Sequence, residues 1–182
     1  GGITTAMGRQ ELAGAGRLAM ERMVREIRAG LPNSFRDGSG DVLDGDKAIT
    51  FISVAWVGVY QESTGKTASF QAFSPDDWPS GADLVSIYAL SWTDIDNGSR
   101  VTEIDNPYPT GCSASGCTVK TEDPLGLDSP GNRVFAAENW VCLERKPNGK
   151  IWINKVPIGD PQNPDPTECA PDEGGVLVNH AR

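Results

Sequence analysis

One long amphipathic helix near the N-terminus is the feature that most constrains how this chain can fold. Over about residues 5–31 the apolar residues recur at helical spacing within a sector about 120° wide, and charged residues fill the opposite arc. The apolar residues of this sector are Leu12, Met20, Met23, Val24, Ile27 and Leu31. Leu18 lies on the polar side instead, where a neighbouring chain can reach it. Pro32 disfavours the α conformation at the preceding residue, so we expect the helix to stop there.

After the helix the sequence has the composition of β-strands. β-branched and aromatic residues predict strands at residues 47–60, 68–73, 83–92, 100–104, 133–145 and 150–156. Gly58 is a candidate for a bulge in the first strand. The Asn148-Gly149 pair predicts a tight turn that joins the last two strands into a hairpin. Two stretches, residues 106–132 and 157–175, are dense in Pro, Gly and Asp and allow no assignment.

This order of elements predicts an α+β fold in a single domain of residues 1–182. We expect one long N-terminal amphipathic helix packed on an antiparallel β-sheet, with sheet and loops occupying residues 47–182. A C-terminal region closed by a disulfide completes the predicted architecture.

The four cysteines are Cys112, Cys117, Cys142 and Cys169. An even number of cysteines in a chain rich in Gly and Pro indicates disulfides, and therefore an oxidising compartment such as the bacterial periplasm or the cell exterior. Four cysteines allow three pairings. We favour Cys112 with Cys117, because the small residues between them permit a tight loop, and this leaves Cys142 with Cys169. A zinc site would need a second close pair of ligands, and we do not expect one.

Charge and hydropathy limit the partners of the chain. The formal net charge of −9 argues against nucleic acid or an anionic membrane as the main partner. The sequence contains no signal peptide and no run of 18 apolar residues. Because disulfides imply export, we expect that an export segment has been removed from the front of the chain.

The sequence does not predict an enzyme. A hydrolase triad needs a base, and the only histidine, His180, is two residues from the C-terminus. Neither a Gly-x-Ser-x-Gly elbow nor a phosphate-binding loop is present. We therefore expect no catalytic residues.

Calcium is the one cofactor that the sequence raises, although we expect none. Oxygen-rich, Gly-containing loops suit Ca²⁺, and two such runs occur. Their residues are Asp37, Asp41, Asp44 and Asp46 in the first run, and Asp94, Asp96, Asn97 and Gly98 in the second. Neither run has the Glu that completes an EF-hand loop at its twelfth position. Side chains of this kind more often form turns between elements, and we favour that interpretation.

Several local motifs resemble one family of proteins. The helix end Leu31-Pro32-Asn33-Ser34, with Arg36 shortly after it, is similar to the "ALPNS-R" pattern of minor pilins of the MSHA pilus, the MshO type. The run of residues 83–90 resembles the "GD-LVIYNL" strand of that family. Trp140-Val141-Cys142 and residues 149–152 resemble its later hairpin. Type II secretion pseudopilins of the J type and PilW-like minor pilins share much of the helix pattern.

The resemblance implies a pilin-like fold and a structural role. The chain would be a minor pilin or pseudopilin, at the tip of a type IV pilus or a type II secretion filament or priming its assembly. Its partners would be other pilin or pseudopilin subunits, and a missing apolar helix would anchor it in the inner membrane before assembly. The mature part would be periplasmic or extracellular. The charged stripe of the helix, with Arg22, Arg25 and Arg28, would face neighbouring subunits.

A secreted carbohydrate-binding or adhesive β-domain is the alternative from a different class. It would use exposed tryptophans as platforms for sugar rings. The candidates are Trp56, Trp78, Trp92, Trp140 and Trp152.

Overall fold

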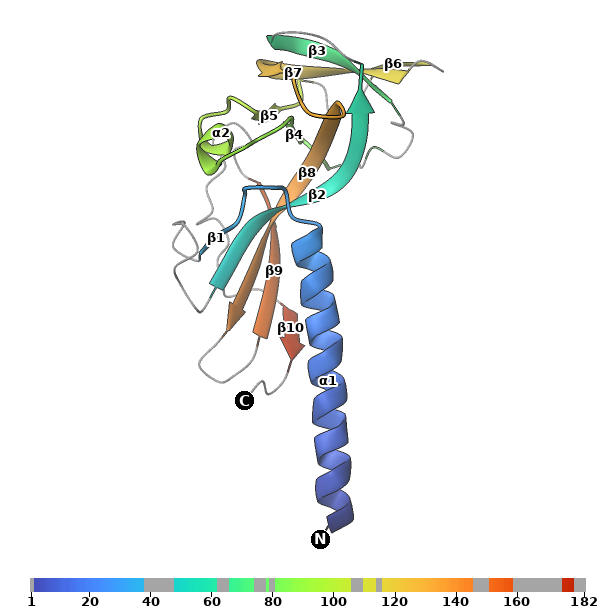
Figure 1. Cartoon of the computed structure of the whole chain (residues 1–182), viewed down its shortest axis with the longest axis vertical. Coiled ribbons are helices and arrows are strands. Elements are labelled where there is room, and N and C mark those ends of the chain that lie inside the picture. The colour runs from blue at the N-terminus through green and yellow to red at the C-terminus, as the bar shows by residue number, and fades with distance from the viewer. Residues whose placement is uncertain are drawn as a thin grey trace.

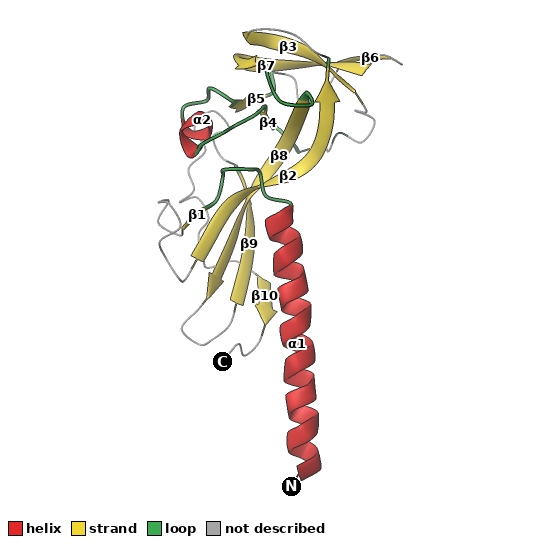
Figure 2. Ribbon diagram, viewed as in Figure 1, coloured by secondary structure: helices red, strands yellow, loops and turns green. Residues whose placement is uncertain are grey.

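The structure of the chain is a computed structural model that describes residues 2–37, 48–61, 66–73, 78, 81–105, 110–113, 116–145, 151–158 and 175–178. Two helices, α1 (Gly2–Arg28) and α2 (Trp92–Asp96), and ten strands lie within these residues (Figures 1 and 2). The strands are β1 (Arg36–Asp37), β2 (Ala48–Tyr60), β3 (Lys66–Phe73), β4 (Leu84–Ser86), β5 (Val101–Glu103), β6 (Thr110–Ser113), β7 (Gly116–Gly126), β8 (Arg133–Arg145), β9 (Ile151–Pro157) and β10 (Gly175–Val178).

Six strands close a small antiparallel ring. β8 pairs with β2, β2 with β3, and β3 with β7. On the other side of the ring β8 pairs with β4, and β4 with β5. A single bridge between Ile104, directly after β5, and Thr121 of β7 joins the two sides. The sheet therefore curls round until its two sides meet, as in a barrel, which removes most exposed strand edges from this part of the molecule.

The ring is filled by side chains of its own strands and of the loops that join them. Aromatic rings dominate the interior: Trp56 and Trp78 lie 4.8 Å apart between centroids, and Tyr60 and Phe70 lie 5.9 Å apart. The other buried residues of this cluster are Ala72, Ala82, Val85, Ile87, Ile104, Val119, Leu125, Leu127, Val134 and Ala136. Burying a large apolar side chain contributes about 1.5–3 kcal/mol, so this interior is a main source of stability.

Below the ring, β2 and β8 continue as a twisted sheet. β8 exchanges β4 for β9 as its neighbour near Glu138, and β9 pairs in turn with β10. β1 pairs with the start of β2. Phe51, Val141, Leu143 and Ile153 form a small buried cluster on this lower sheet, and Met23, Ile27, Phe35 and Ile49 pack against it while partly exposed. This cluster is where the last turns of α1 meet the sheet.

The predicted α+β arrangement, with a long helix packed on the sheet, is wrong. The structure is mainly antiparallel β, and its apolar interior is covered by the sheet curling on itself rather than by a helix. α1 runs beside β9 and β10 and then extends past both strands (Figure 1). Ala19 is buried and Met23 and Ile27 are partly buried, but Met20 and Val24, which we expected on the buried face, are exposed. The amphipathic pattern identified the helix correctly but not what covers its apolar residues.

The strand predictions hold for the long regular segments. β2, β3, β8 and β9 lie where the composition placed them. The segment predicted as a strand at residues 83–92 forms only the short β4, followed by a loop and the start of α2. The unassigned residues 106–132 contain β6 and the 11-residue β7. Alternating burial at Cys117, Val119 and Thr121 was a strand signal that the surrounding Gly and Pro obscured.

Gly58 has a packing role and is not a bulge. It pairs in register with Val134, and the irregularities of β2 lie between Ser53 and Trp56 instead. The ring of Trp56 lies directly over Gly58, because residues two apart in a strand share a face. A β carbon at this position would overlap the ring.

Neither Cys117 nor Cys142 is a free cysteine. They are not joined to each other, because β7 and β8 are separated by β3 and β2, and neighbouring strands lie about 4.8 Å apart. Two of the three pairings therefore remain. The β6–β7 hairpin has Ser113 opposite Gly116 and Thr110 opposite Thr118 with an irregularity between them, so Cys112 and Cys117 lie on paired strands close to the turn. The side chain of Cys112 and all of Cys169 lie outside the described residues, so the predicted pairing stays a prediction that this register favours.

No helix among the residues that the structure describes is long and apolar enough to span a lipid bilayer.

Replacing Gly58 with Ala should destabilise the ring. The new methyl group would displace the buried Trp56 ring, which should cost about 1–3 kcal/mol of unfolding free energy. Urea unfolding followed by tryptophan fluorescence measures this loss. Gly14→Ala is the matched control: Gly14 is exposed on α1 with open space around it, so the substitution should raise helicity and leave ring stability unchanged. Equal stability of the Gly58→Ala variant and the parent would contradict this account of the core.

The disulfides should be Cys112–Cys117 and Cys142–Cys169. Peptide mapping of the unreduced protein should recover both linkages. Removing the second by Cys142→Ser with Cys169→Ser should cost on the order of 3 kcal/mol, because the disulfide closes a loop of 26 intervening residues and restricts the unfolded chain. Recovery of Cys112 joined to Cys142, with Cys117 joined to Cys169, would overturn the assignment.

Candidate functional site

The exposed side of α1 is the first candidate surface. Leu18, Met20 and Val24 are 68%, 59% and 37% exposed, which is high for large apolar side chains on a helix. They lie in the same turns of α1 as Ala19, Met23 and Ile27, and helical spacing puts Leu18 on a different side of the helix from Met20 and Val24. Exposed apolar side chains of this size on a helix are typical of a surface that another chain covers.

The cations of α1 lie on the same exposed helix. Arg22, Arg25 and Arg28 are all exposed, and Arg25 and Arg28 are in the last turn, where positive charge is favoured by the helix dipole. Their side chains form no ion pair within the described part of the chain. The neighbouring ion pairs are Arg17 with Glu21 at 2.9 Å, and Glu26 with Lys155 of β9 at 2.7 Å. The second of these pairs links α1 to the sheet. The three predicted interface arginines take part in neither pair and are therefore available for contact with another chain.

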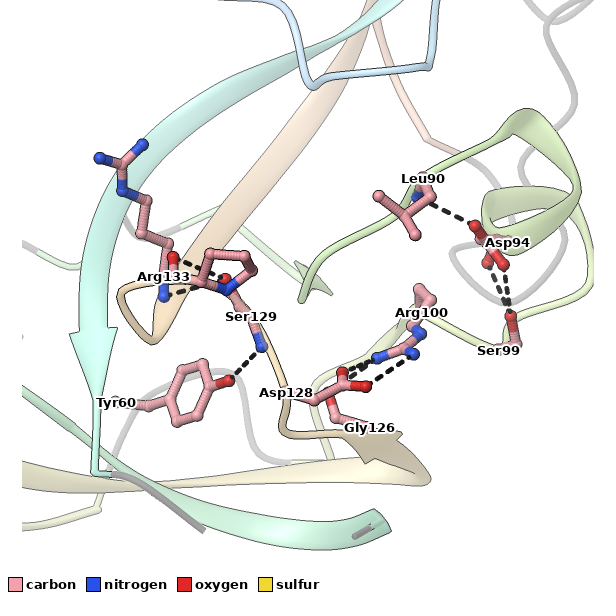
Figure 3. A network of polar contacts seen from close by, with 10 residues as sticks. Tyr60, Leu90, Asp94, Ser99, Arg100, Gly126, Asp128, Ser129 and Arg133 are labelled. Atoms are coloured by element: carbon pink, nitrogen blue, oxygen red, sulfur yellow. Dashed lines mark hydrogen bonds and ion pairs between the residues drawn. The ribbon is translucent and has the colours of Figure 1, made fainter. Parts of the chain in front are cut away.

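A groove at the junction between helix and ring is the second candidate surface. Its volume is about 280 Å³, and its lining comes from three segments: the chain just after α1, the loop after β4, and the turn before β8. The first segment contributes Leu31, Pro32 and Asn33. Each segment is held by its own hydrogen bonds (Figure 3 shows the last two).

The Leu31-Pro32-Asn33-Ser34 segment fastens the end of α1 to the ring. Leu31 is buried, and its amide donates to the Ile52 carbonyl at 2.7 Å. The buried Ser34 hydroxyl donates to the Leu31 carbonyl at 2.7 Å and accepts from the Ile52 amide at 3.1 Å. Asn33 adopts a φ of 65°, which Asn tolerates better than most residues, and its side chain donates to the Ala89 carbonyl at 2.8 Å. This segment therefore forms one wall of the groove and is tied to the loop after β4, which forms another.

The turn before β8 forms the second wall. Ser129-Pro130-Gly131-Asn132 is closed by a 2.9 Å hydrogen bond from the Asn132 amide to the Ser129 carbonyl. Pro at the second position and Gly at the third, with a φ of 70°, are the residues that a type II turn requires. The Ser129 amide donates to the hydroxyl of Tyr60 at 2.9 Å, and the Arg133 amide donates to the Ser129 hydroxyl at 3.2 Å. These bonds, drawn in Figure 3, fix Ser129 and the start of β8 to the ring interior.

The loop after β4 forms the third wall and is fixed by Asp94. The Asp94 carboxylate accepts from the amides of Leu90 and Ser91 at 2.9 and 3.0 Å, and Ser91 caps α2 in return (Figure 3). Partial burial would raise the pKa of Asp94, but the hydrogen bonds from Leu90, Ser91 and Ser99 outweigh it and hold this pKa below its ordinary value. The carboxylate is therefore ionised at neutral pH and keeps Leu90 in place at the groove.

Tyr88 in this wall has an unusual backbone. Its φ is 54°, in the left-handed region that aromatic residues rarely adopt. The residues around it are held: the Ile87 amide donates to the Arg100 carbonyl at 2.9 Å, and the Ala89 carbonyl accepts from Asn33. Tyr88 packs against the ring interior while partly exposed to the groove. Strain of this kind persists only where the surrounding structure enforces it, and it gathers at binding sites.

An ion pair joins the last two walls. Arg100, directly before β5, pairs with Asp128, directly before Ser129 (Figure 3). The hydrogen bond from Arg100 lowers the pKa of Asp128 against the opposing effect of burial, and the same bond raises the pKa of Arg100. Because the Asp128 side chain is 62% exposed, the pair contributes little stability, and its effect is to hold the two loops in register.

The second acidic run that we weighed for calcium forms a cap and a turn, as we favoured. Asp94 caps α2, and the Asn97 side chain accepts from the Ser99 amide at 3.0 Å, which closes an Asx turn. Among the described residues no three His, Cys, Asp or Glu side chains gather as a metal site would require. Asp41, Asp44, Asp46 and the side chain of Asp37 lie outside the described residues, as does His180.

Three of the five tryptophans cannot act as exposed platforms. Trp56, Trp78 and Trp140 are buried in the interior. Trp92 is partly buried and carries the Arg36 guanidinium 4.4 Å from its ring centroid, a cation–π contact. Trp152 is also partly buried. The tryptophans are mainly core residues in this fold.

The groove residues Tyr88, Leu90 and Arg133 were not singled out from the sequence. The Ser-Pro-Gly-Asn turn beside Arg133 was a readable signal, because Pro-Gly in the middle of a turn specifies its type. Nothing local indicated that this turn, the helix end and the loop after β4 would meet. These three segments are too far apart in the sequence for a helix or strand repeat to indicate that they meet.

Comparison with models of known protein families, with curated proteins and with solved structures found no match for this chain.

Replacing Asp94 with Asn should lower the free energy of unfolding by about 0.5–1 kcal/mol at neutral pH. The variant loses a charged acceptor at the start of α2, and this acceptor holds the loop that carries Leu90. A carboxyl whose folded pKa is lowered stabilises the fold above its unfolded pKa of about 3.9 and ceases to do so as the pH falls through the folded pKa. The stability difference between parent and variant should therefore vanish in acid. Urea unfolding across this pH range measures it.

Asp96→Asn is the control for this prediction, because Asp96 is exposed on the same short helix and is not part of the cap. It should leave stability nearly unchanged at neutral pH. A difference between parent and Asp94→Asn that stays constant into acid would show that the carboxylate charge is not what holds the loop.

Proposed function

We propose that this chain is a structural subunit that acts by contact with other subunits in an assembled filament. More specifically, we infer that it is the ectodomain of a minor pilin or pseudopilin, with an assembly role at the tip or in priming of a type IV pilus or a type II secretion filament. Its partners are then other pilin or pseudopilin subunits. Its setting is the periplasm or cell exterior, with an inner-membrane anchor before assembly.

The observation that carries the proposal is the set of exposed apolar side chains on α1. Leu18, Met20 and Val24 are exposed on sides of the helix that the lower sheet does not cover. Water-exposed apolar side chains on a protruding helix gain free energy when a second helix covers them. Because α1 covers only the small lower cluster, its other sides are open to contact with other subunits.

Charge gives such a contact its register. Arg22, Arg25 and Arg28 are exposed on the same helix of a chain whose net charge is −9, so the helix end is a positive feature on an acidic protein. Acidic surfaces of neighbouring copies or related subunits would complement it. Complementary charges of this kind set orientation and partner choice more than affinity.

The same proposal makes the chain non-enzymatic. The polar groups gathered at the junction hold loops and caps, and each of Tyr60, Asp94 and Ser129 is engaged in a structural hydrogen bond. A contact function needs a shaped and rigid surface, which these bonds provide.

Charge reversal on α1 tests the proposal in the native host. Deletion of the full-length gene should reduce filament number or filament-dependent adhesion, measured by electron microscopy and adhesion assays. The full-length gene carrying Arg22→Glu and Arg25→Glu should fail to restore assembly, because repulsion replaces attraction at the helix surface. Circular dichroism of the variant chain should match the parent.

Lys120→Glu with Arg145→Glu is the matched control, since both residues are exposed on strands and the change in charge is the same. This variant should restore assembly. Full rescue by the α1 variant would remove the interface claim, and a deletion strain with normal filaments and adhesion would refute the filament proposal itself.

A further inference from the structure

We propose that the groove between the end of α1 and the ring is a docking site for an extended segment of a partner protein. The segment inserts one large apolar side chain into the groove and pairs an adjacent carboxylate with Arg133. This inference does not depend on the filament proposal, because it rests on a different surface.

The groove is preformed. Its three walls are fixed by the Ser34 bridge to Ile52, by the Tyr60–Ser129 bond and by the Asp94 cap. Asn33 ties the first wall to the third through the Ala89 carbonyl. A site whose walls are already ordered loses little entropy on binding, which favours affinity even for a short segment.

The size and lining of the groove suit a single apolar side chain. About 280 Å³ lies just below the usual range of small-molecule pockets, so the groove accommodates one anchor rather than a large cofactor. Pro32, Tyr88, Leu90, Pro130 and Phe135 provide apolar contact. Leu90 lies at the rim of the groove and is 60% exposed, so a bound segment would cover it.

Arg133 gives the groove its charge preference. Its side chain is exposed and lines the groove, and within the described residues its guanidinium has neither an ion pair nor a hydrogen bond; only its amide is engaged. Figure 3 shows this side chain directed away from the bonded network. On a chain with a net charge of −9 an uncompensated cation beside an apolar groove attracts a carboxylate. The combination selects an acidic segment with a large apolar residue.

The test uses two blocked tetrapeptides, Gly-Phe-Asp-Gly and Gly-Phe-Lys-Gly, added at millimolar concentrations to the isotope-labelled chain while amide shifts are followed by NMR. The acidic peptide should shift the amides of Leu90, Ser129 and Arg133 and bind about fivefold more tightly than the basic one, as expected for one rim ion pair. Arg133→Glu should abolish or reverse this preference. Leu90→Ser should weaken both peptides.

Arg145→Glu is the control, because Arg145 is exposed at the opposite end of the same strand. It should leave both affinities unchanged, and the thermal stabilities of the variants should match the parent. Equal binding of the two peptides, or a preference that survives Arg133→Glu, would overturn the role of Arg133. Absence of shifts at the groove with these peptides and with Gly-Leu-Asp-Gly would overturn the docking site.

Discussion

β2 and β8 pair with each other along almost their whole lengths, and every other part of the described structure is attached to this pair. Each strand has 13 residues, long enough to serve the ring at one end and the lower sheet at the other. The remaining strands of the ring add to the upper ends, and β1 and β9 add to the lower ends. Gly30, two residues after α1, pairs with Ser53 of β2 between them. The irregularities of β2 between Ser53 and Trp56 lie at this transition, where the strand must bend.

The closure of the ring explains why α1 is free. A flat antiparallel sheet has an apolar face that a helix must cover, but here the sheet turns that face inward and fills it with Trp56, Tyr60, Phe70 and Trp78. The helix is then needed only at the small lower cluster, through Met23 and Ile27. Leu18, Met20 and Val24 of α1 stay exposed to water, which is a cost unless another chain covers them. The two candidate contact surfaces follow from this division of the molecule: the exposed helix, and the groove where the helix leaves the ring.

A few polar groups fix the shape of the groove. The Ser34 hydroxyl, the Tyr60 hydroxyl and the Asp94 carboxylate each satisfy backbone amides that a loop would otherwise leave unpaired. Such bonds stabilise loops weakly in water but position them well when the bonding groups are partly buried. The strained backbone of Tyr88 is held between two of these anchored segments.

Periodicity and turn chemistry by themselves determined the long elements: the helix that becomes α1, the strands β2, β3, β8 and β9, and the order in which they occur. These elements are decided locally. A repeat of 3.6 or 2 residues indicates a helix or a strand, and a Pro or Gly affects the backbone only near its own position. Local signals failed for β7, where Pro124 and two glycines obscured the alternation, and for β4, which ends at Ser86, just before the positive φ of Tyr88. Only the tertiary structure decided that the sheet closes on itself, that Met20 and Val24 stay exposed, and that the groove forms from three distant segments. The reason is physical: whether an apolar face is covered by a helix, by its own sheet or by another chain depends on which covering buries the most surface, and that comparison involves residues far apart in the sequence.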